Sequence, residues 1–225
     1  PDAWDQDWRE HAHESLGLFL VQYLCNGFNL ADAARLVYDD HYFKSGKKSF
    51  RFIRKKTEDR SDTEIVIPII EPLQKILDEI AAKPEKGALV FPQIYAGETD
   101  ENKQKARISQ ENQNIRKRLG RLVKSMGWEV APSGTWCRHS FATNLSHAGG
   151  VPKEYIQEAM GHSVMSGTVT DRYIQSYPIA QQMQFNSKLL KIGDQFDALD
   201  ELGNLSLEEL KAALAFVRSR KNVGG

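Results

Sequence analysis

The sequence has little cysteine and no long apolar run. Its 225 residues include only Cys25 and Cys137, both in apolar surroundings, and no CxxC pair. This argues against a disulfide framework or a cysteine-based zinc site and is typical of a reducing, intracellular compartment. No apolar stretch is long enough to span a bilayer, and no signal peptide is visible. We therefore expect a cytoplasmic protein that does not enter a membrane.

The sequence also lacks net charge, because 30 Lys and Arg residues balance 30 Asp and Glu residues. Affinity for a polyanion must therefore come from local segregation of charge. Such segregation is present: seven basic residues and no acid occur from Lys44 to Lys56, and five more occur from Arg116 to Lys124. The acids gather near the N-terminus and at 194–209. A single charge run is usually a solvated face, but two such clusters favour binding of a polyanion.

Length and composition suit one globular domain with an appendage. We place the domain at 1–192 and the appendage at 193–225, where an acidic, loop-like segment leads into an amphipathic helix at 206–220. That helix opens with a capping box from Ser206 to Glu209. The chain begins at Pro1 rather than Met, so we expect it to be a fragment that lacks an N-terminal part.

Hydrophobic periodicity predicts an α+β protein that is mainly helical and has one small antiparallel sheet. Alternating apolar residues at 47–57 and 63–69, with the polar stretch 58–62 between them, predict the hairpin. Asn29 is a suitable N-cap, and Pro72 suits the first turn of a helix. The expected helices are 8–25, 30–38, 70–82, 108–126, 137–148, 152–160, 166–176 and 206–220.

The stretch GTWCRHSFATNL at 134–145 places an arginine at the head of a helix. Phe141 and Leu145 give this helix an apolar face that would enter the core. The helix would therefore hold the guanidinium of Arg138 rigidly, either as a cap on a structural network or as a ligand for an anion.

Three further side chains suggest phosphate chemistry together with Arg138. Lys56 ends a predicted strand, His162 follows Gly161, and Tyr173 lies 11 residues beyond His162. Arginine binds phosphate oxygens bidentately, histidine donates or moves a proton, lysine can protonate a departing alkoxide, and tyrosine can be a covalent nucleophile. No Gly-rich phosphate loop, HExxH motif or carboxylate pair stands out. Lys47 and Lys55 compete with Lys56 for its role, and Tyr177 competes with Tyr173.

These motifs identify a family. RHSFATNL at 138–145, EAMGHS at 158–163 and DRYI at 171–174 resemble the catalytic domain of the tyrosine recombinase (phage integrase) family. CNGFNLADAARL at 25–36 resembles the segment of its first arginine, and IRKKTEDRSDTEIVIPI at 53–69 resembles its lysine hairpin. The order and rough spacing match over most of the chain. The resemblance implies the family's helical catalytic-domain fold, without the N-terminal DNA-binding domain that family members usually carry.

The resemblance also implies a mechanism. Tyr173 would attack a DNA phosphorus and form a 3′-phosphotyrosine while the 5′ oxygen leaves. Arg138 and His162 would bind the phosphate oxygens, and Lys56 would protonate the leaving oxygen. No metal or cofactor is needed, because the bond energy stays in the phosphotyrosine.

The resemblance also implies binding partners and a cellular location. The partner would be double-stranded DNA, bound by a homo-oligomer that forms a tetrameric synapse. The protein would be DNA-associated, in a prokaryotic or phage context such as a mobile element. The C-terminal helix would dock in cis or on a neighbouring protomer. The basic side chains expected to contact DNA are Lys47, Lys48, Arg51, Arg54, Lys55, Arg116, Arg118 and Arg121.

Two positions depart from the family pattern. Asn29 stands where the first arginine would be, and Thr135 stands where the first histidine would be. Loss of one preorganised donor typically costs about 10²–10³ in rate. Arg51 or Arg54 on the hairpin could supply the missing cation, whereas Arg35 should point elsewhere. These departures leave open a second function, a catalytically impaired DNA-binding relative.

Some positions also have ordinary structural explanations. Asn29 is as suitable an N-cap as a phosphate ligand, and Asp32 is either a first-turn acid or a group that orients basic side chains. His139 is expected to be packed or hydrogen-bonded within its helix. A third function, a helical interaction protein with no role on DNA, conflicts with the two basic clusters.

Overall fold

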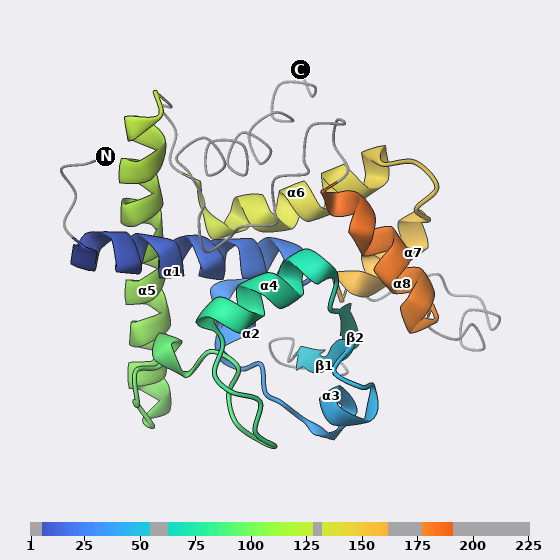
Figure 1. Ribbon diagram of the computed structural model, residues 1–225, viewed down its shortest axis with the longest axis horizontal. Coiled ribbons are helices and arrows are strands. Elements are labelled where there is room, and N and C mark those ends of the chain that lie inside the picture. Colours follow the sequence, from blue (N-terminus) through green and yellow to red (C-terminus); the bar gives the residue numbers. More distant parts are fainter. Residues whose placement is uncertain (1–5, 55–62, 128–131, 162–176, 191–225) are drawn as a thin grey trace.

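The computed structural model describes residues 6–54, 63–127, 132–161 and 177–190. In these ranges the chain is mainly helical with a two-stranded antiparallel sheet (Figure 1), which confirms the predicted α+β class. The elements are α1 (Gln6–Leu24), α2 (Leu30–Ala34), α3 (Asp40–Lys44), β1 (Ser49–Arg54), β2 (Thr63–Pro68), α4 (Glu71–Ile80), the short 3-10 helix η1 (Pro92–Ile94), α5 (Glu101–Ser125), α6 (Gly134–His147), α7 (Lys153–Ala159), α8 (Ile179–Asn186) and the 3-10 helix η3 (Ser187–Leu189).

Helix α1 is at the centre of the core. Its side chains Leu16, Phe19 and Tyr23 are fully buried, and helices α4, α5 and α6 all contact it. Figure 1 shows the long helix α5 running across α1. Burial of large apolar side chains stabilises a fold, and α1 contributes several of them to this core.

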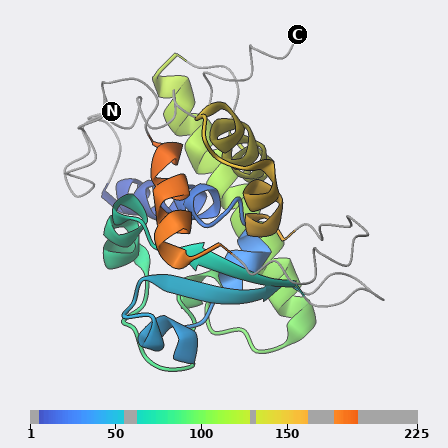
Figure 2. The same cartoon turned by 90° about the vertical axis from the view of Figure 1, so that its right-hand side faces the viewer.

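The hairpin packs one face against the core. Phe50 and Phe52 on β1 are buried and pair with Ile67 and Ile65 on β2, while Ile53 is exposed. This is the alternation that the sequence predicts for a half-buried sheet. Figure 2 shows α8 beside the sheet, in agreement with its contacts to β2. Strand β2 therefore contacts both the segment after α1 and the C-terminal helices α7 and α8.

Several helix boundaries differ from the sequence prediction. Helix α5 begins at Glu101 rather than near residue 108, because Asp100 caps it by accepting a hydrogen bond from the Lys103 amide at 2.9 Å. Helix α2 ends at Ala34 instead of continuing to Tyr38, because the chain then forms a bridge between Val37 and Leu89.

Two other differences concern whole helices. Helices α3 and α8 were not predicted. The helices predicted at 166–176 and 206–220, and the appendage 193–225, lie outside the described residues. None of the helices in the described ranges is long and apolar enough to cross a membrane.

Candidate functional site

Arg138 connects three segments that are far apart in the sequence. It lies in the first turns of α6, and its Nη1 donates to the Gly27 carbonyl at 3.2 Å. Its Nη2 donates to the Met160 carbonyl at 3.0 Å. The guanidinium is therefore held at the junction of α6, the turn after α1, and the end of α7. These are three of the segments that carry the predicted phosphate motifs.

The packing of α6 explains why the arginine is held there. Phe141 and Leu145 are completely buried, as the sequence predicts. The thiol of Cys137 is buried and donates to the Phe19 carbonyl at 3.3 Å. Burial raises the pKa of Cys137 far above its usual value, so this thiol stays protonated beside Arg138. Cys137, Phe141 and Leu145 thus anchor the helix in the core, and this packing fixes the position of Arg138.

Gly27 allows α6 to approach closely. Its φ is +67°, a conformation that side chains rarely adopt, and an added Cβ would lie 3.0 Å from the Arg138 Cα and 3.3 Å from the Phe141 Cβ. The helix expected at 8–25 ends just before this turn, close to the observed end of α1. The close approach to α6 could not be predicted, since it depends on contacts across more than a hundred residues.

A buried polar network, missed in the sequence, supports this turn. Asn26 donates to the Val66 carbonyl at 3.0 Å and accepts from the Asn186 side chain at 2.9 Å. Asn186 in turn accepts from the Tyr155 hydroxyl at 2.7 Å. Because Asn26 and Asn186 are both fully buried, each hydrogen bond satisfies a group that would otherwise be costly. The network ties the turn beneath Arg138 to β2, α7 and α8.

Two tyrosines of the C-terminal region have structural roles. Burial, and to a lesser degree Glu158, raises the pKa of Tyr155, which is hydrogen-bonded in the core. Tyr177 packs edge-on against the ring of Tyr155, with ring centroids 5.5 Å apart, and also against Phe185. Burial first, then nearby carboxylates, raises the pKa of Tyr177 as well. These contacts favour a packing role for Tyr177 over its use as a nucleophile.

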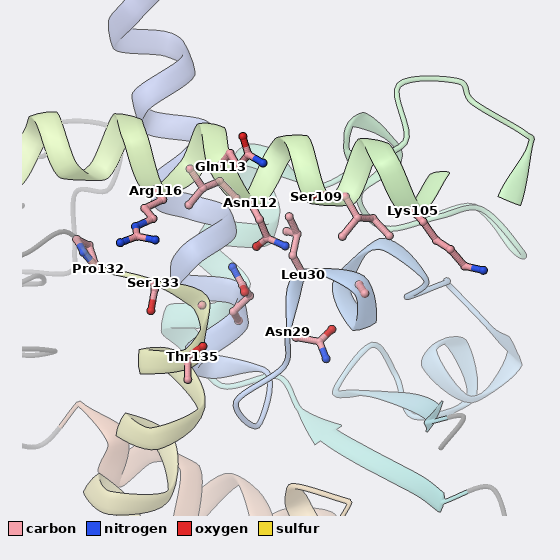
Figure 3. A pocket seen from close by; sticks show the side chains of 15 residues that line it. Asn29, Leu30, Lys105, Ser109, Asn112, Gln113, Arg116, Pro132, Ser133 and Thr135 are labelled. Atoms are coloured by element: carbon pink, nitrogen blue, oxygen red, sulfur yellow. The ribbon is translucent and has the colours of Figure 1, made fainter. Parts of the chain in front are cut away.

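Asn29 and Thr135, the two positions that depart from the family pattern, lie on one groove. Its volume is about 570 Å³, and Lys105 and Arg116 of α5 also line it (Figure 3). The side chain of Asn29 caps α2 by accepting from the Asp32 amide at 2.8 Å, so its capping role is observed. Neither polar side chain carries charge, and the cations of this groove come from α5.

The arginines considered as substitutes for the first arginine have other partners. Arg35 pairs with the buried Asp32 at 3.0 Å and lies over the Phe52 ring. Arg51 pairs with Asp39 at 3.2 Å on the exposed face of the hairpin. The side chain of Arg54 lies outside the described residues.

The expected DNA-contacting residues of α5 point in different directions. Arg118 is tied to α1 by its Nη1, which donates to the Ser15 hydroxyl at 3.1 Å, and it also donates to Glu111 of its own helix at 3.4 Å. Arg121 lies over the Trp8 ring at 4.8 Å, also on the side of α1. Arg116 instead lines the groove with Asn29 and Thr135.

The structure describes only some of the remaining predicted site residues. Lys47 and Lys48 are exposed before β1, and His139 is exposed on α6 rather than packed in the core. Lys55, Lys56, His162 and Tyr173 lie outside the described residues. The described His, Cys, Asp and Glu side chains form no group of three or more that could hold a metal ion.

The chain matches a known protein family over most of its length. The model of the phage integrase family matches residues 11–178. This range contains the turn at Gly27, the hairpin, Arg138 and Met160. No curated protein and no solved structure matches the chain.

Proposed function

Because this chain belongs to the phage integrase family, we propose that it cleaves and rejoins DNA strands through a covalent 3′-phosphotyrosine at Tyr173. The family match supports DNA recombination of the tyrosine recombinase type. The observation that carries the finer proposal is the position of Arg138. Its guanidinium is bonded to Gly27 and Met160, so three motif segments meet at one cation.

Arg138 has the properties that a phosphate ligand requires. A guanidinium stays charged at every physiological pH, and its planar fork matches the non-bridging oxygens of a phosphate. Two hydrogen bonds to backbone carbonyls restrict its rotation before DNA arrives. Preorganised charge of this kind stabilises a transition state without reorganisation during the reaction. Arg138 would therefore bind the charge that builds up on the pentacoordinate phosphorus.

The proposed reaction uses three more residues, which the family motifs supply. The phenol oxygen of Tyr173 forms a bond to phosphorus, and the bond from phosphorus to the 5′ oxygen breaks. Lys56 gives a proton to the departing oxygen, and His162 donates to another phosphate oxygen. Attack of a 5′ hydroxyl on the phosphotyrosine reverses the step, which permits strand exchange. In the proposed assembly, four protomers hold two duplexes, and the C-terminal helix at 206–220 docks in cis or in trans.

A second candidate function is a DNA-binding relative with impaired catalysis. Asn29 uses its side-chain oxygen to cap α2, and Thr135 brings only a hydroxyl to the site. Two lost donors could each reduce the rate by about 10²–10³. The positions of Asn29 and Thr135 on a groove with Arg116 and Lys105 favour retained DNA binding in either case.

Covalent trapping tests the proposal. The chain is incubated with nicked duplexes whose sequence around the nick is randomised, and adducts are detected after denaturation and mapped by mass spectrometry. We expect an adduct at Tyr173 that Tyr173→Phe and Arg138→Ala abolish, whereas Tyr177→Phe, the matched control, retains it. Duplex binding without any adduct would support the impaired relative, and an adduct at another residue would refute the assignment of Tyr173.

A further inference from the structure

Asn26 lies in the turn between α1 and α2, one residue before the glycine whose carbonyl accepts a hydrogen bond from Arg138. Its φ is +55°, in the left-handed region, which asparagine adopts more readily than most other residues that carry a side chain. Asn26 is completely buried, so its side chain cannot touch DNA. Any role of Asn26 in the reaction must therefore pass through the groups to which it is bonded.

Both ends of the Asn26 side-chain amide are hydrogen-bonded. Its Nδ2 donates to the Val66 carbonyl at 3.0 Å, and its Oδ1 accepts from Nδ2 of Asn186 at 2.9 Å. Val66 belongs to β2, which pairs with β1, and β1 ends two residues before Lys56. Asn186 belongs to α8, which begins six residues after Tyr173. The Asn26 amide thus joins the turn that holds the guanidinium to two elements that adjoin, along the chain, the proposed acid and the proposed nucleophile.

A second acceptor of Arg138 is linked to the same hydrogen bonds. The Tyr155 hydroxyl of α7 donates to Asn186 Oδ1 at 2.7 Å. Met160, whose carbonyl accepts from Arg138 Nη2 at 3.0 Å, is the C-cap of this helix, five residues beyond Tyr155. A displacement of Asn186 would therefore reach the guanidinium from two sides, through Gly27 and through Met160. We call these bonded groups, the side chains of Asn26, Asn186 and Tyr155 with the Val66 carbonyl, the Asn26 network.

The Asn26 network is suited to fixing positions. Hydrogen bonds constrain both distance and direction, whereas apolar contacts constrain mainly distance. The side chains of Asn26, Asn186 and Tyr155 are all buried, and a buried polar network whose members are satisfied makes the segments that it joins rigid. Rigidity matters at a reacting centre, because a misplacement of about 1 Å can cost about 10²-fold in rate even when the change lies far from the chemistry.

We infer that Asn26 is a positioning residue for strand cleavage, which holds Arg138 in a fixed place relative to the hairpin and to α8. It acts through the Gly27 carbonyl, next to it in the chain, and through Asn186 and Tyr155 on the helix that ends at Met160. This inference rests on the proposed function, because it concerns the rate of that reaction. It adds to that function a buried residue that sets the rate without contacting DNA.

Separate measurements of reaction rate and of DNA affinity test the inference. The rate constant of adduct formation is measured for the full chain and its variants in excess over the randomised nicked duplexes. The dissociation constant for the same duplexes is measured in a Tyr173→Phe background, which removes the proposed nucleophile. Circular dichroism sets a temperature at which every variant is fully folded.

Two substitutions disrupt the network in different ways. Asn26→Gly removes both hydrogen bonds and suits the positive φ. Asn26→Asp keeps the shape and the bond from Asn186, but its carboxylate cannot donate to the Val66 carbonyl. We expect each variant to lower the rate constant by about 10- to 100-fold. The dissociation constant should change by less than about twofold, because the exposed cations that bind phosphates are untouched. If one variant does not fold, the other decides.

Asn144→Ala is the matched control. Asn144 is also a buried asparagine and lies on the same helix as Arg138. Its side-chain amide donates to the Tyr23 hydroxyl at 2.7 Å rather than to a member of the Asn26 network. We expect Asn144→Ala to lower stability, as the loss of a buried hydrogen bond does, while the folded protein keeps the rate constant of the unchanged chain.

The outcomes separate the inference from the function on which it rests. A folded Asn26 variant that reacts as fast as the unchanged chain would overturn the inference alone. So would equal losses of rate in the Asn26 variants and Asn144→Ala, since these would reflect a general loss of stability. A slower reaction explained entirely by weaker DNA binding would also overturn it. If the unchanged chain forms no adduct, both the inference and the proposed function fail.

Discussion

The Nη1 atom of Arg138 donates a hydrogen bond to the carbonyl of Gly27, although the two residues are 111 positions apart in the sequence. The same glycine lets α6 approach, because an added Cβ would lie 3.0 Å from the Arg138 Cα. The anchor of the arginine and the space for its helix therefore depend on one residue. Four predictions concern this site, the network beneath it and two other buried side chains.

Gly27→Ala should destabilise the fold and move Arg138. The positive φ costs an alanine roughly 1–2 kcal/mol, and the contact with the α6 backbone adds to that cost. Gly87→Ala is the matched control, since Gly87 has a φ of +80° and nothing within 4 Å of an added Cβ. We expect Gly27→Ala to lower the free energy of unfolding more than Gly87→Ala, and only Gly27→Ala to reduce adduct formation. Equal losses of stability would mean that the close contact is unimportant.

Asn186→Ala should be strongly destabilising. It removes the partners of the Asn26 oxygen and the Tyr155 hydroxyl, both in the core. Leaving a buried polar group unsatisfied costs about 1–3 kcal/mol. Chemical denaturation measures the effect, and Gln184→Ala on the exposed face of α8 is the control. A change as small as that of the control would show that water replaces the lost partner.

Gly134→Ala should clash with Gln22. An added Cβ would lie 2.7 Å from Gln22 Oε1, a buried oxygen with no hydrogen-bond partner in the described structure. Overpacking typically costs about 1–3 kcal/mol. In a Gln22→Ala background the clash disappears, so Gly134→Ala should become neutral or stabilise the helix by up to about 1 kcal/mol. A double-mutant cycle measures this coupling, and additive effects of the two substitutions would contradict it.

Stability should fall at alkaline pH in a way that depends on Tyr38. Burial, followed by Tyr42 and Asp78, raises the pKa of Tyr38 from 10.0 to about 12. Between these values the unfolded chain releases the proton and the folded chain keeps it, so the free energy of unfolding falls as pH rises. The contribution of one group is at most roughly 1.4 kcal/mol per pH unit.

Tyr38→Phe isolates this contribution. The variant loses the hydrogen bond to the Ala82 carbonyl at 2.8 Å, which should lower stability by about 1 kcal/mol at neutral pH. Its stability should then decline less steeply than that of the unchanged chain from pH 10 upward, as measured by urea denaturation at several pH values. Parallel declines would exclude Tyr38 as a source of the alkaline sensitivity.

Much of the architecture was predictable from local patterns. Alternation of apolar residues predicted the hairpin, and helical periodicity of apolar residues predicted α1, α4 and α6. These elements could be predicted because each of them buries a regular face. The first turns of α5 contain almost no apolar residue, so periodicity gave no signal there. The available signal was Asp100, an N-cap that precedes a run of good helix formers. Helix α8 was missed for a similar reason, since its packing depends on Tyr155 and Tyr177 rather than on a local pattern.

The site was only partly predictable. The helix around Arg138 and the break at Gly27 followed from the sequence, but their contact did not. The different roles of Arg116 and Arg118 could have been foreseen, because two residues along a helix are about 200° apart. The hydrogen bond from Arg118 to Ser15 of α1 could not have been foreseen, since Ser15 is distant in the chain.

The hydrogen bonds that join Arg138 to Gly27 and Met160 end on main-chain oxygens, an atom that any amino acid supplies. Exchange of the Met160 side chain for another apolar one would thus leave the anchor intact. Insertion or deletion of a single residue in the turn that follows α7 would shift the Met160 carbonyl and remove its hydrogen bond to the guanidinium. The site is consequently tolerant of replacements at position 160 but intolerant of changes in loop length.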